Sequence, residues 1–408
     1  MKVVIAGAGL GGMSAAWRLA QNGHEVTILE ASNRVGGRSW SEALPNGEYV
    51  ERGGEFINPA DHIIRGLCAE LELPLIPHGI VFDRRWMPDG NRMSVDELKG
   101  HIRKLYETIA EIVASRQTEV SLEAAAAQAF GNSYRENPMY IRLATSLAND
   151  PSKVSAWATH HQVRGRSATS YIEHGARVLG GNNAVTLAIH KQLGDVVHLN
   201  TAIAAVEQNS RGVVMTSTDG KEFVADFGVI AIPLPKLTAL AKDLKLSELA
   251  RSAIETREMG VAAKISIVAR SEATPRGMQY PDALWWTWNS ASPASDASLH
   301  VATGFAGGQG AIDDLNLQDG GTSWRDKVKA YRTDLDLTDD FLMTNWADQP
   351  FTGGAYSAPG LQWRPEFDGA FDTLQGRIAF AGEHTGTQST LNGAATTGLR
   401  AARLINAM

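Results

Sequence analysis

The first thirty residues alternate between apolar and polar stretches in a pattern that predicts two strands around a helix. Residues 2–6 (KVVIA) form a short β-branched run that is typical of a buried strand. Residues 13–22 place Ala16 and Leu19 on one face of a helix, and residues 26–29 (VTIL) form a second apolar run. This order predicts a strand, a helix and a second, parallel strand at the start of the chain.

Three glycines, Gly7, Gly9 and Gly12, occupy the turn between the first strand and the helix. Gly7 suits the tight turn, Gly9 lets the backbone approach a pyrophosphate, and Gly12 lets the helix pack closely on the strand. A diphosphate would then face the unpaired N–H groups of the helix N-terminus. Glu30 follows near the end of the second strand, where a carboxylate accepts hydrogen bonds from a ribose diol. In this order, the features predict a dinucleotide-binding site.

A second glycine-rich turn follows in residues 31–38 (ASNRVGGR). Gly36 and Gly37 allow the backbone to fold tightly. Arg34 and Arg38 flank this doublet, and two guanidinium groups suit the two negative charges of a diphosphate. The alternative interpretation is a solvated hairpin with ordinary surface arginines.

Size and charge restrict the classes of partner. At 408 residues the chain is expected to form two domains. Its net charge is −7, without a block of Lys and Arg, which argues against nucleic acid and against an anionic membrane. No apolar run approaches the ~20 residues that span a bilayer, and the first strand begins at residue 2, without room for a targeting segment. With Cys68 as the only cysteine, we expect a soluble, cytoplasmic protein without disulfides and with a buried packing thiol.

The later pattern predicts an α/β fold whose nucleotide domain is interrupted twice. Residues 78–175 are rich in helix-forming residues and predict a helical insertion. A helix at 183–193, a strand at 196–208 and a hairpin at 211–226 then return the chain to α/β character. The predicted nucleotide domain comprises residues 1–77, 178–253 and 349–408, and a mixed α+β substrate (cap) domain comprises residues 78–177 and 254–348.

The second segment of the predicted cap domain, residues 254–348, contains the polar and aromatic positions of greatest interest. Lys264 lies on a strand with alternating apolar and polar residues. A lysine that points inward from such a strand destabilises the fold by several kcal/mol unless it has a function. The alternative is that its side chain extends to solvent. Trp285, Trp286 and Trp288 are typical of core packing, with a substrate wall as the alternative. The chain has no Cys/His spacing for zinc, so we predict no metal site.

These pieces together resemble the flavin-containing monoamine oxidase family, which includes polyamine oxidases and L-amino acid oxidases. The resemblance covers almost the whole chain. It is carried by Gly7, Gly9, Gly12 and Glu30, by 34–38 (RVGGR), 53–57 (GGEFI), Gly180 with Gly181, Gly260 with Lys264, Asn345 with Trp346, 352–356 (TGGAY) and 380–383 (FAGE).

The resemblance implies a Rossmann-like, discontinuous FAD-binding domain of the GR2 type. The adenosine diphosphate would lie on the first strand–helix–strand unit, with Arg38 near the pyrophosphate and Ile203 beside the adenine. Gly382 and Glu383 would meet the phosphate and ribityl region. The last helix would point its N-terminus near Leu391 at the flavin, where the positive end of the helix dipole stabilises the reduced anion.

The resemblance also implies the residues around the flavin ring. Gly54, Glu55 and Phe56 belong to the cofactor-binding set. Lys264 would hold a water against flavin N5, and Trp346 would line the ring. Tyr356 would form one wall of the substrate cage, while Thr390 stands at the other wall, so the cage would be only half aromatic. Ala355 stands where some members attach flavin through a cysteine, which predicts non-covalent FAD.

The function that follows is FAD-dependent oxidation of an amine to an imine. Oxygen or another acceptor would then reoxidise the flavin, and with oxygen the product would be hydrogen peroxide. The alternatives are an L-amino acid oxidase, a desaturase or dehydrogenase, or a flavoprotein that binds or senses without turnover. Glu55 would repel a substrate carboxylate, which favours an amine without one. Arg84 and Arg85 are the reason for doubt, because either could hold a carboxylate. A homodimer is an open alternative to a monomer.

Overall fold

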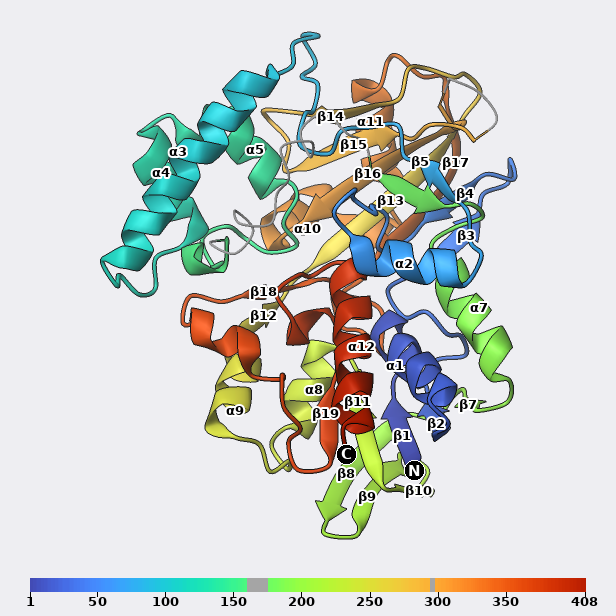
Figure 1. Cartoon of the computed structure of the whole chain (residues 1–408). Helices are drawn as coiled ribbons and strands as arrows, with labels where there is room; N and C mark the ends of the chain where they lie inside the picture. The colour runs from blue at the N-terminus through green and yellow to red at the C-terminus, as the bar shows by residue number, and fades with distance from the viewer. Residues whose placement is uncertain (160–174, 294–297) are drawn as a thin grey trace.

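The computed structural model describes residues 1–159, 175–293 and 298–408 (Figure 1). Its lower half in Figure 1 is built on a five-stranded parallel sheet, which confirms the predicted α/β character. In spatial order the strands are β19 (Ile378–Phe380), β11 (Phe227–Ile230), β1 (Lys2–Ala6), β2 (Glu25–Leu29) and β7 (Val197–His198). The two ends of the chain therefore contribute strands to one sheet.

The side chains of β1 alternate between two layers that cover the sheet. Val3 and Ile5 pack into one hydrophobic cluster, whereas Val4 and Ala6 pack into another, as expected for a strand buried on both faces. The first cluster includes α1 (Leu10–Gln21), α2 (His62–Glu70), α7 (Ala184–Leu193) and α12 (Leu391–Asn406). The second includes the antiparallel strands β8 (Ile203–Asn209), β9 (Gly212–Ser217) and β10 (Glu222–Ala225), with α8 (Leu234–Leu240) and α9 (Glu248–Glu255). Cys68 is buried in the first cluster, as predicted.

A second sheet of five antiparallel strands forms much of the upper half in Figure 1. In spatial order its strands are β14 (Arg276–Gln279), β15 (Trp285–Asn289), β16 (Val301–Gly307), β13 (Ala262–Ala269) and β17 (Leu337–Asn345). Ala263, Ile265 and Ile267 of β13 pack into the cluster that contains α10 (Gln309–Leu315) and α11 (Thr322–Tyr331). Because side chains alternate along a strand, Lys264 faces the other side of this sheet.

A group of helices lies beside the second sheet and forms its own core (Figure 1). It consists of α3 (Val95–Ala114), α4 (Leu122–Phe130), η1 (Tyr134–Glu136), α5 (Pro138–Ala144) and η2 (Ala156–Thr159). Ser94 and Glu97 start α3 with a capping box, in which each side chain accepts from the other's backbone N–H. The helical character predicted for this segment is therefore present, although residues 160–174 of it lie outside the described part.

Shorter elements complete the fold. They are β3 (Ser41–Ala43) paired with β4 (Tyr49–Glu51), β5 (Leu75–Pro77) with β6 (Ala176–Val178), β12 (Arg257–Met259) with β18 (Ser357–Pro359), and the 3-10 turns η3 (Leu317–Asp319), η4 (Pro365–Gly369) and η5 (Glu383–Thr385). The single strand predicted over 196–208 was wrong, because the chain turns at Asn200, which has a φ of +54°, and divides this segment between two sheets. Within the described residues, no helix has the length and apolar character needed to cross a membrane.

The helices α1 and α12 approach each other backbone to backbone at two glycines. A Cβ on Gly398 would lie 2.2 Å from Gly11 O and 2.9 Å from the Ser14 Cβ. A Cβ on Gly11 would lie 2.9 Å from Gly382 N. Only glycine allows this approach, which places the start of α12 beside the β1–α1 loop.

A buried carboxyl group ties the β3–β4 hairpin to the start of α7. Glu51 Oε2 accepts from Ser41 Oγ at 2.7 Å, and Glu51 Oε1 accepts from Asn182 N at 2.7 Å. Burial raises the pKa of Glu51 to about 7, although these two hydrogen bonds oppose the shift. The carboxyl group is therefore half protonated near neutral pH.

Replacing Gly398 by Ala should separate α1 from α12, because the new methyl group would overlap the Gly11 carbonyl. We expect the free energy of unfolding to fall by about 1–3 kcal/mol, measured by urea unfolding. Gly100→Ala is the matched control, since Gly100 lies in α3 and a Cβ there would meet nothing within 4 Å. That control should gain up to about 1 kcal/mol from helix propensity. Equal effects of the two substitutions would contradict the close approach.

Glu51→Gln should remove a pH dependence of stability. The folded-state pKa of Glu51 is about 7 and the ordinary value is 4.5, so the folded protein binds more protons between these pH values and loses stability as the pH rises through 7. We expect the variant to gain up to about 3 kcal/mol over the native protein between pH 4 and pH 8. Urea unfolding at both pH values measures this. Glu222→Gln, at an exposed position, is the control, and a pH-independent difference for Glu51→Gln would refute the shift.

Candidate active site

One continuous cavity of about 1110 Å³ is lined by residues of both sheets. Every predicted site residue except Gly12 lies on its wall. These residues are Gly7, Gly9, Glu30, Arg34, Gly36, Gly37, Arg38, Gly54, Glu55, Phe56, Ile203, Lys264, Trp346, Tyr356, Gly382, Glu383, Thr390 and Leu391. The fold therefore brings segments from the whole length of the chain to one place.

The loop between β1 and α1 forms one end of the cavity. Gly7 has a φ of +99°, in the region that favours glycine. A Cβ on Gly12 would lie 1.9 Å from Gly7 O, so Gly12 serves the packing of α1, whereas a Cβ on Gly9 would meet nothing within 4 Å. Among the described residues, no side chain caps α1, and its first turn has no acidic residue. The open N–H groups of this helix fit the diphosphate of a dinucleotide.

Glu30 is held rigidly at the end of β2. Its Oε2 accepts from Ala8 N at 2.8 Å, and its Oε1 accepts from Ser32 N at 2.9 Å and from Ser32 Oγ at 2.7 Å. A carboxylate offers about four lone-pair sites, so an acceptor position remains for a hydroxyl group in the cavity. This geometry fits a ribose diol.

The two arginines of the second glycine turn have different surroundings. Arg34 donates to Gly37 O at 2.8 Å and stacks on Trp40 at 4.0 Å, so its guanidinium group stabilises the turn itself. Arg38 Nη1 donates to Glu383 Oε1 at 2.8 Å. Burial alone would raise the pKa of Glu383, but the charges of Arg38 and His384 and the hydrogen bond from Ser357 bring it to about 2.

The start of α12 faces the cavity, and Thr390 caps it. The Thr390 Oγ1 accepts from Gly393 N at 3.1 Å, so the hydroxyl group acts as a helix cap. A Cβ on Gly54 would lie 2.8 Å from a methyl group of Leu391, which makes Gly54 a point of close contact with this helix. Thr390 was predicted as the second wall of a substrate cage. It lines the cavity, but its hydroxyl group belongs to the helix start.

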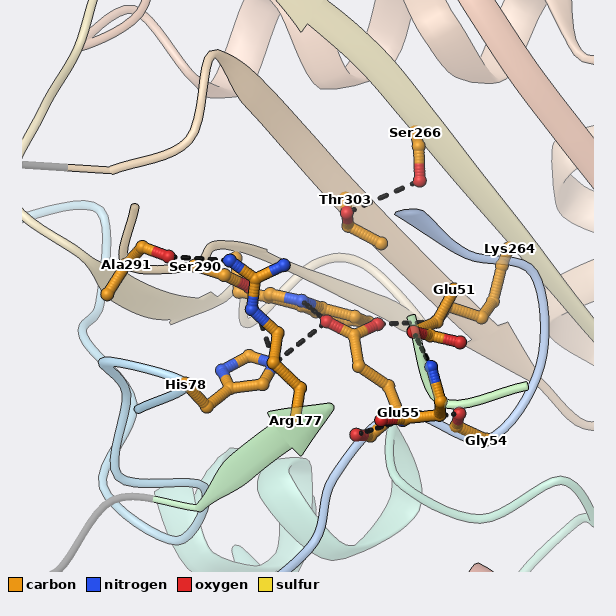
Figure 2. A network of polar contacts seen from close by, with 12 residues as sticks. Glu51, Gly54, Glu55, His78, Arg177, Lys264, Ser266, Ser290, Ala291 and Thr303 are labelled. Atoms are coloured by element: carbon orange, nitrogen blue, oxygen red, sulfur yellow. Dashed lines mark hydrogen bonds and ion pairs between the residues drawn. The ribbon is translucent and has the colours of Figure 1, made fainter. Parts of the chain in front are cut away.

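Lys264 points inward and is bound by Glu55 (Figure 2). Its Nζ donates to Glu55 Oε2 at 2.5 Å and to Gly53 O at 3.2 Å. Burial alone would raise the pKa of Glu55, but the Lys264 ammonium and hydrogen bonding from His78 hold it well below its usual range. The Lys264 ammonium group compensates the charge of Glu55 and so weakens the physical basis for a repulsion of substrate carboxylates by Glu55, which stays a prediction.

Aromatic rings enclose the end of the cavity beyond Lys264. Besides Tyr356, the rings that line it are Phe56, Phe82, Trp286, Trp288 and Phe305. Trp286 and Trp288 lie on one face of β15, whereas Trp285 packs into the core on the other face. The predicted core packing is confirmed for all three tryptophans, because each is buried in a hydrophobic cluster, and Trp286 and Trp288 also line the cavity. The half-aromatic cage of Tyr356 and Thr390 stays a prediction. The two-residue spacing of Trp286 and Trp288 on a strand was the signal that the sequence offered.

The two arginines early in the insertion do not line the cavity in the described structure. Arg84 donates to Met93 O at 3.3 Å. Arg85 is only 2% exposed and lies behind the wall, with its guanidinium group 3.5 Å from the Trp286 ring and a hydrogen bond of 2.6 Å to Ser146 Oγ. Burial, followed by the positive charge of Arg142, lowers the pKa of Arg85 well below its usual value. No carboxylate forms an ion pair with Arg85 among the described residues.

Comparisons with known proteins agree with this geometry. The sequence model of the family "flavin containing amine oxidoreductase" matches residues 10–406. A protein of Mycobacterium tuberculosis H37Rv, named as the flavin-containing monoamine oxidase AofH, is 30% identical over 268 residues, and the alignment covers 59% of this chain and 59% of that protein. An L-amino acid dehydrogenase of Synechocystis is 23% identical over 98% of this chain and 94% of its own length.

A solved structure of putrescine oxidase with bound putrescine superposes with a TM-score of 0.80 at 19% identity, and the match covers 100% of both chains. This similarity supports the fold, while the match over residues 10–406 assigns the family. The open helix start at Gly9 and the fixed carboxylate of Glu30 fit FAD. The chain belongs to the flavin-containing amine oxidoreductase family, and FAD is its cofactor.

Proposed function

We propose that this enzyme binds FAD without a covalent bond and oxidises the C–N bond of a small amine to an imine. Water then hydrolyses the imine to a carbonyl compound, and oxygen or another acceptor takes the electrons; with oxygen the product is hydrogen peroxide. The residues that we assign to FAD are those predicted from the sequence. The GR2-type architecture and the division into an FAD domain (1–77, 178–253, 349–408) and a cap domain (78–177, 254–348) are part of this proposal.

The observation that carries the proposal is the continuity of the cavity. Its wall runs from the glycine loop at Gly9 past Lys264 to the aromatic rings around Trp286 without a break. A dinucleotide at one end therefore shares its cavity with a substrate at the other. Ala355 also lines the cavity, and its methyl group has no atom that could form a bond to the flavin.

Bound FAD would supply the group that accepts two electrons from the amine. The protein binds the cofactor with the α1 N-terminus, Glu30 and Arg38. The aromatic wall excludes water and orients the amine, which is how positioning lowers the barrier. Lys264 is the buried cation on the wall between these two regions.

A second candidate is the oxidation of an L-amino acid. The observation that favours it is Arg85, a buried guanidinium group behind Trp286 and Ser146. Asp83 is close enough to attract its charge but is paired with Arg142, and no described carboxylate forms an ion pair with Arg85. A buried charge is costly unless a counter-charge reaches it. A substrate carboxylate could provide this charge if the wall rearranged, and the relative in Synechocystis is named an L-amino acid dehydrogenase.

Glu30→Ala should weaken FAD binding by about 1.5–3 kcal/mol, the range for a charge-assisted hydrogen bond. Titration of apoprotein with FAD, followed by flavin fluorescence, measures the Kd. Ser32→Ala is the matched control, because it removes the hydroxyl donor to Glu30 but keeps the carboxylate. An FAD affinity of Glu30→Ala equal to that of the control would place the ribose elsewhere.

A small amine should exceed the corresponding amino acid in kcat/KM by at least tenfold, which is about 1.4 kcal/mol. The physical reason is that, among the described residues, no lining cation at the aromatic end is free for a carboxylate, since Lys264 is paired with Glu55 and Arg85 lies behind the wall. Steady-state assays with pairs of an amino acid and its decarboxylated amine measure the ratio. A tenfold preference for the amino acid in the native protein that disappears in Arg85→Gln would establish the second candidate instead.

A further inference from the structure

We propose that Glu55 is a positioning residue that fixes the ammonium group of Lys264 and balances its charge, so that the Lys264–Glu55 pair sets the reduction potential of the bound flavin. This inference rests on the FAD site proposed above. It assigns to Glu55 a role different from contact with cofactor or substrate.

The carboxylate of Glu55 is bound on both oxygens (Figure 2). Oε2 accepts from Lys264 Nζ at 2.5 Å. Oε1 accepts from Trp288 Nε1 at 2.7 Å and lies 2.8 Å from His78 Nε2. Because an ionised carboxylate only accepts, His78 Nε2 must carry the proton of this contact. Three donors thus hold a carboxylate that is almost completely buried, which leaves it little freedom to turn toward a ligand.

The same contacts orient Lys264. An ammonium group has three N–H bonds, and two of them are directed at Glu55 Oε2 and Gly53 O. Lys264 also lines the cavity. The remaining N–H is therefore the only one that can serve a group in the cavity, and its direction is set by Glu55 and by the backbone at Gly53.

The charges around the pair support a nearly neutral unit at the flavin. Lys264 and Glu55 cancel each other, and burial lowers the pKa of His78, which keeps the imidazole neutral at neutral pH. Among the described residues, Arg177 is another nearby cation, and it donates to Ala291 O at 2.7 Å rather than to Glu55. Glu51, whose pKa is about 7, lies near the pair and is bound by Ser41 and Asn182. Lys264 and Glu55 are thus opposite charges in direct contact beside the Gly53 turn.

The flavin gains negative charge when it is reduced, so a net positive charge nearby favours the reduced form and a net negative charge disfavours it. Removing the charge of Glu55 should therefore raise the reduction potential, and removing the charge of Lys264 should lower it. Removing both charges should leave the potential near its original value. A purely structural role of Glu55 would not give shifts of opposite sign.

The test is the midpoint potential of bound FAD in the native protein and in Glu55→Gln, Lys264→Met and the double variant, measured by anaerobic dye equilibration. We expect each single variant to change the reduced-to-oxidised equilibrium at least tenfold, in opposite directions, which is about 30 mV for a two-electron couple. The double variant should lie within threefold of the native protein. Glu222→Gln makes the same chemical change as Glu55→Gln at an exposed site, and it should show no shift.

Shifts of both single variants in one direction, or changes below threefold, would overturn the inference. If Glu55→Gln does not retain FAD, the midpoint potentials of Lys264→Arg and Lys264→Met are compared instead. Lys264→Arg keeps the positive charge, so its reduced-to-oxidised equilibrium should stay within threefold of the native protein. The equilibrium of Lys264→Met should not. FAD retention by the native protein is read separately from its absorbance spectrum. Loss of FAD from the native protein would refute the proposed function, whereas normal retention without shifts would refute only the role of Glu55.

Discussion

The backbone contact between α1 and α12 is the constraint on which the site depends. At Gly11 and Gly398 two helices from opposite ends of the chain come closer than any side chain would allow. This approach places Gly382, Glu383 and the start of α12 against the β1–α1 loop. Without it, the cavity would lose one wall, and the α12 helix start would not face the same space as the α1 helix start.

A second constraint is the compensation of buried charge. The site contains several ionised groups with little access to water, and such groups are stable only with partners. Arg38 is paired with Glu383, and Lys264 with Glu55. These pairs connect segments that are far apart in the chain, so they also hold the wall of the cavity together. Their charges cancel, which leaves an enclosure that is polar in places but nearly neutral.

This neutrality bears on the chemistry. In the part of the chain that the structure describes, the aromatic rings and balanced ion pairs of the cavity provide no strong charge for a substrate to bind, so recognition there depends on shape and on exclusion of water. Such an environment suits a neutral amine, the form that can be oxidised. Arg85 is the exception, because its cation lies behind the ring of Trp286.

The sequence alone determined the local parts of the protein. The spacing of Gly7, Gly9 and Gly12, with Glu30 after the second strand, identified the nucleotide end, because this geometry depends on the backbone of one continuous segment. The alternation around Lys264 predicted an inward lysine for the same reason. Even the residues of the cavity wall were mostly found, since the resemblance supplied their order.

Only the tertiary structure decided what those side chains touch. Glu55 and Lys264 are 209 residues apart, and their ion pair exists because β13 packs beside the Gly53 turn. Likewise, the position of Arg85 behind Trp286 and the division of residues 196–208 between two sheets result from long-range packing. The local sequence does not specify contacts between residues that are so far apart in the chain. The interaction energies of these contacts arise only after the sheets and helices have assembled. The sequence therefore identified most of the predicted site residues that line the cavity, whereas the packing of distant elements added rings such as Phe82 and Phe305 and determined how the charges are paired there.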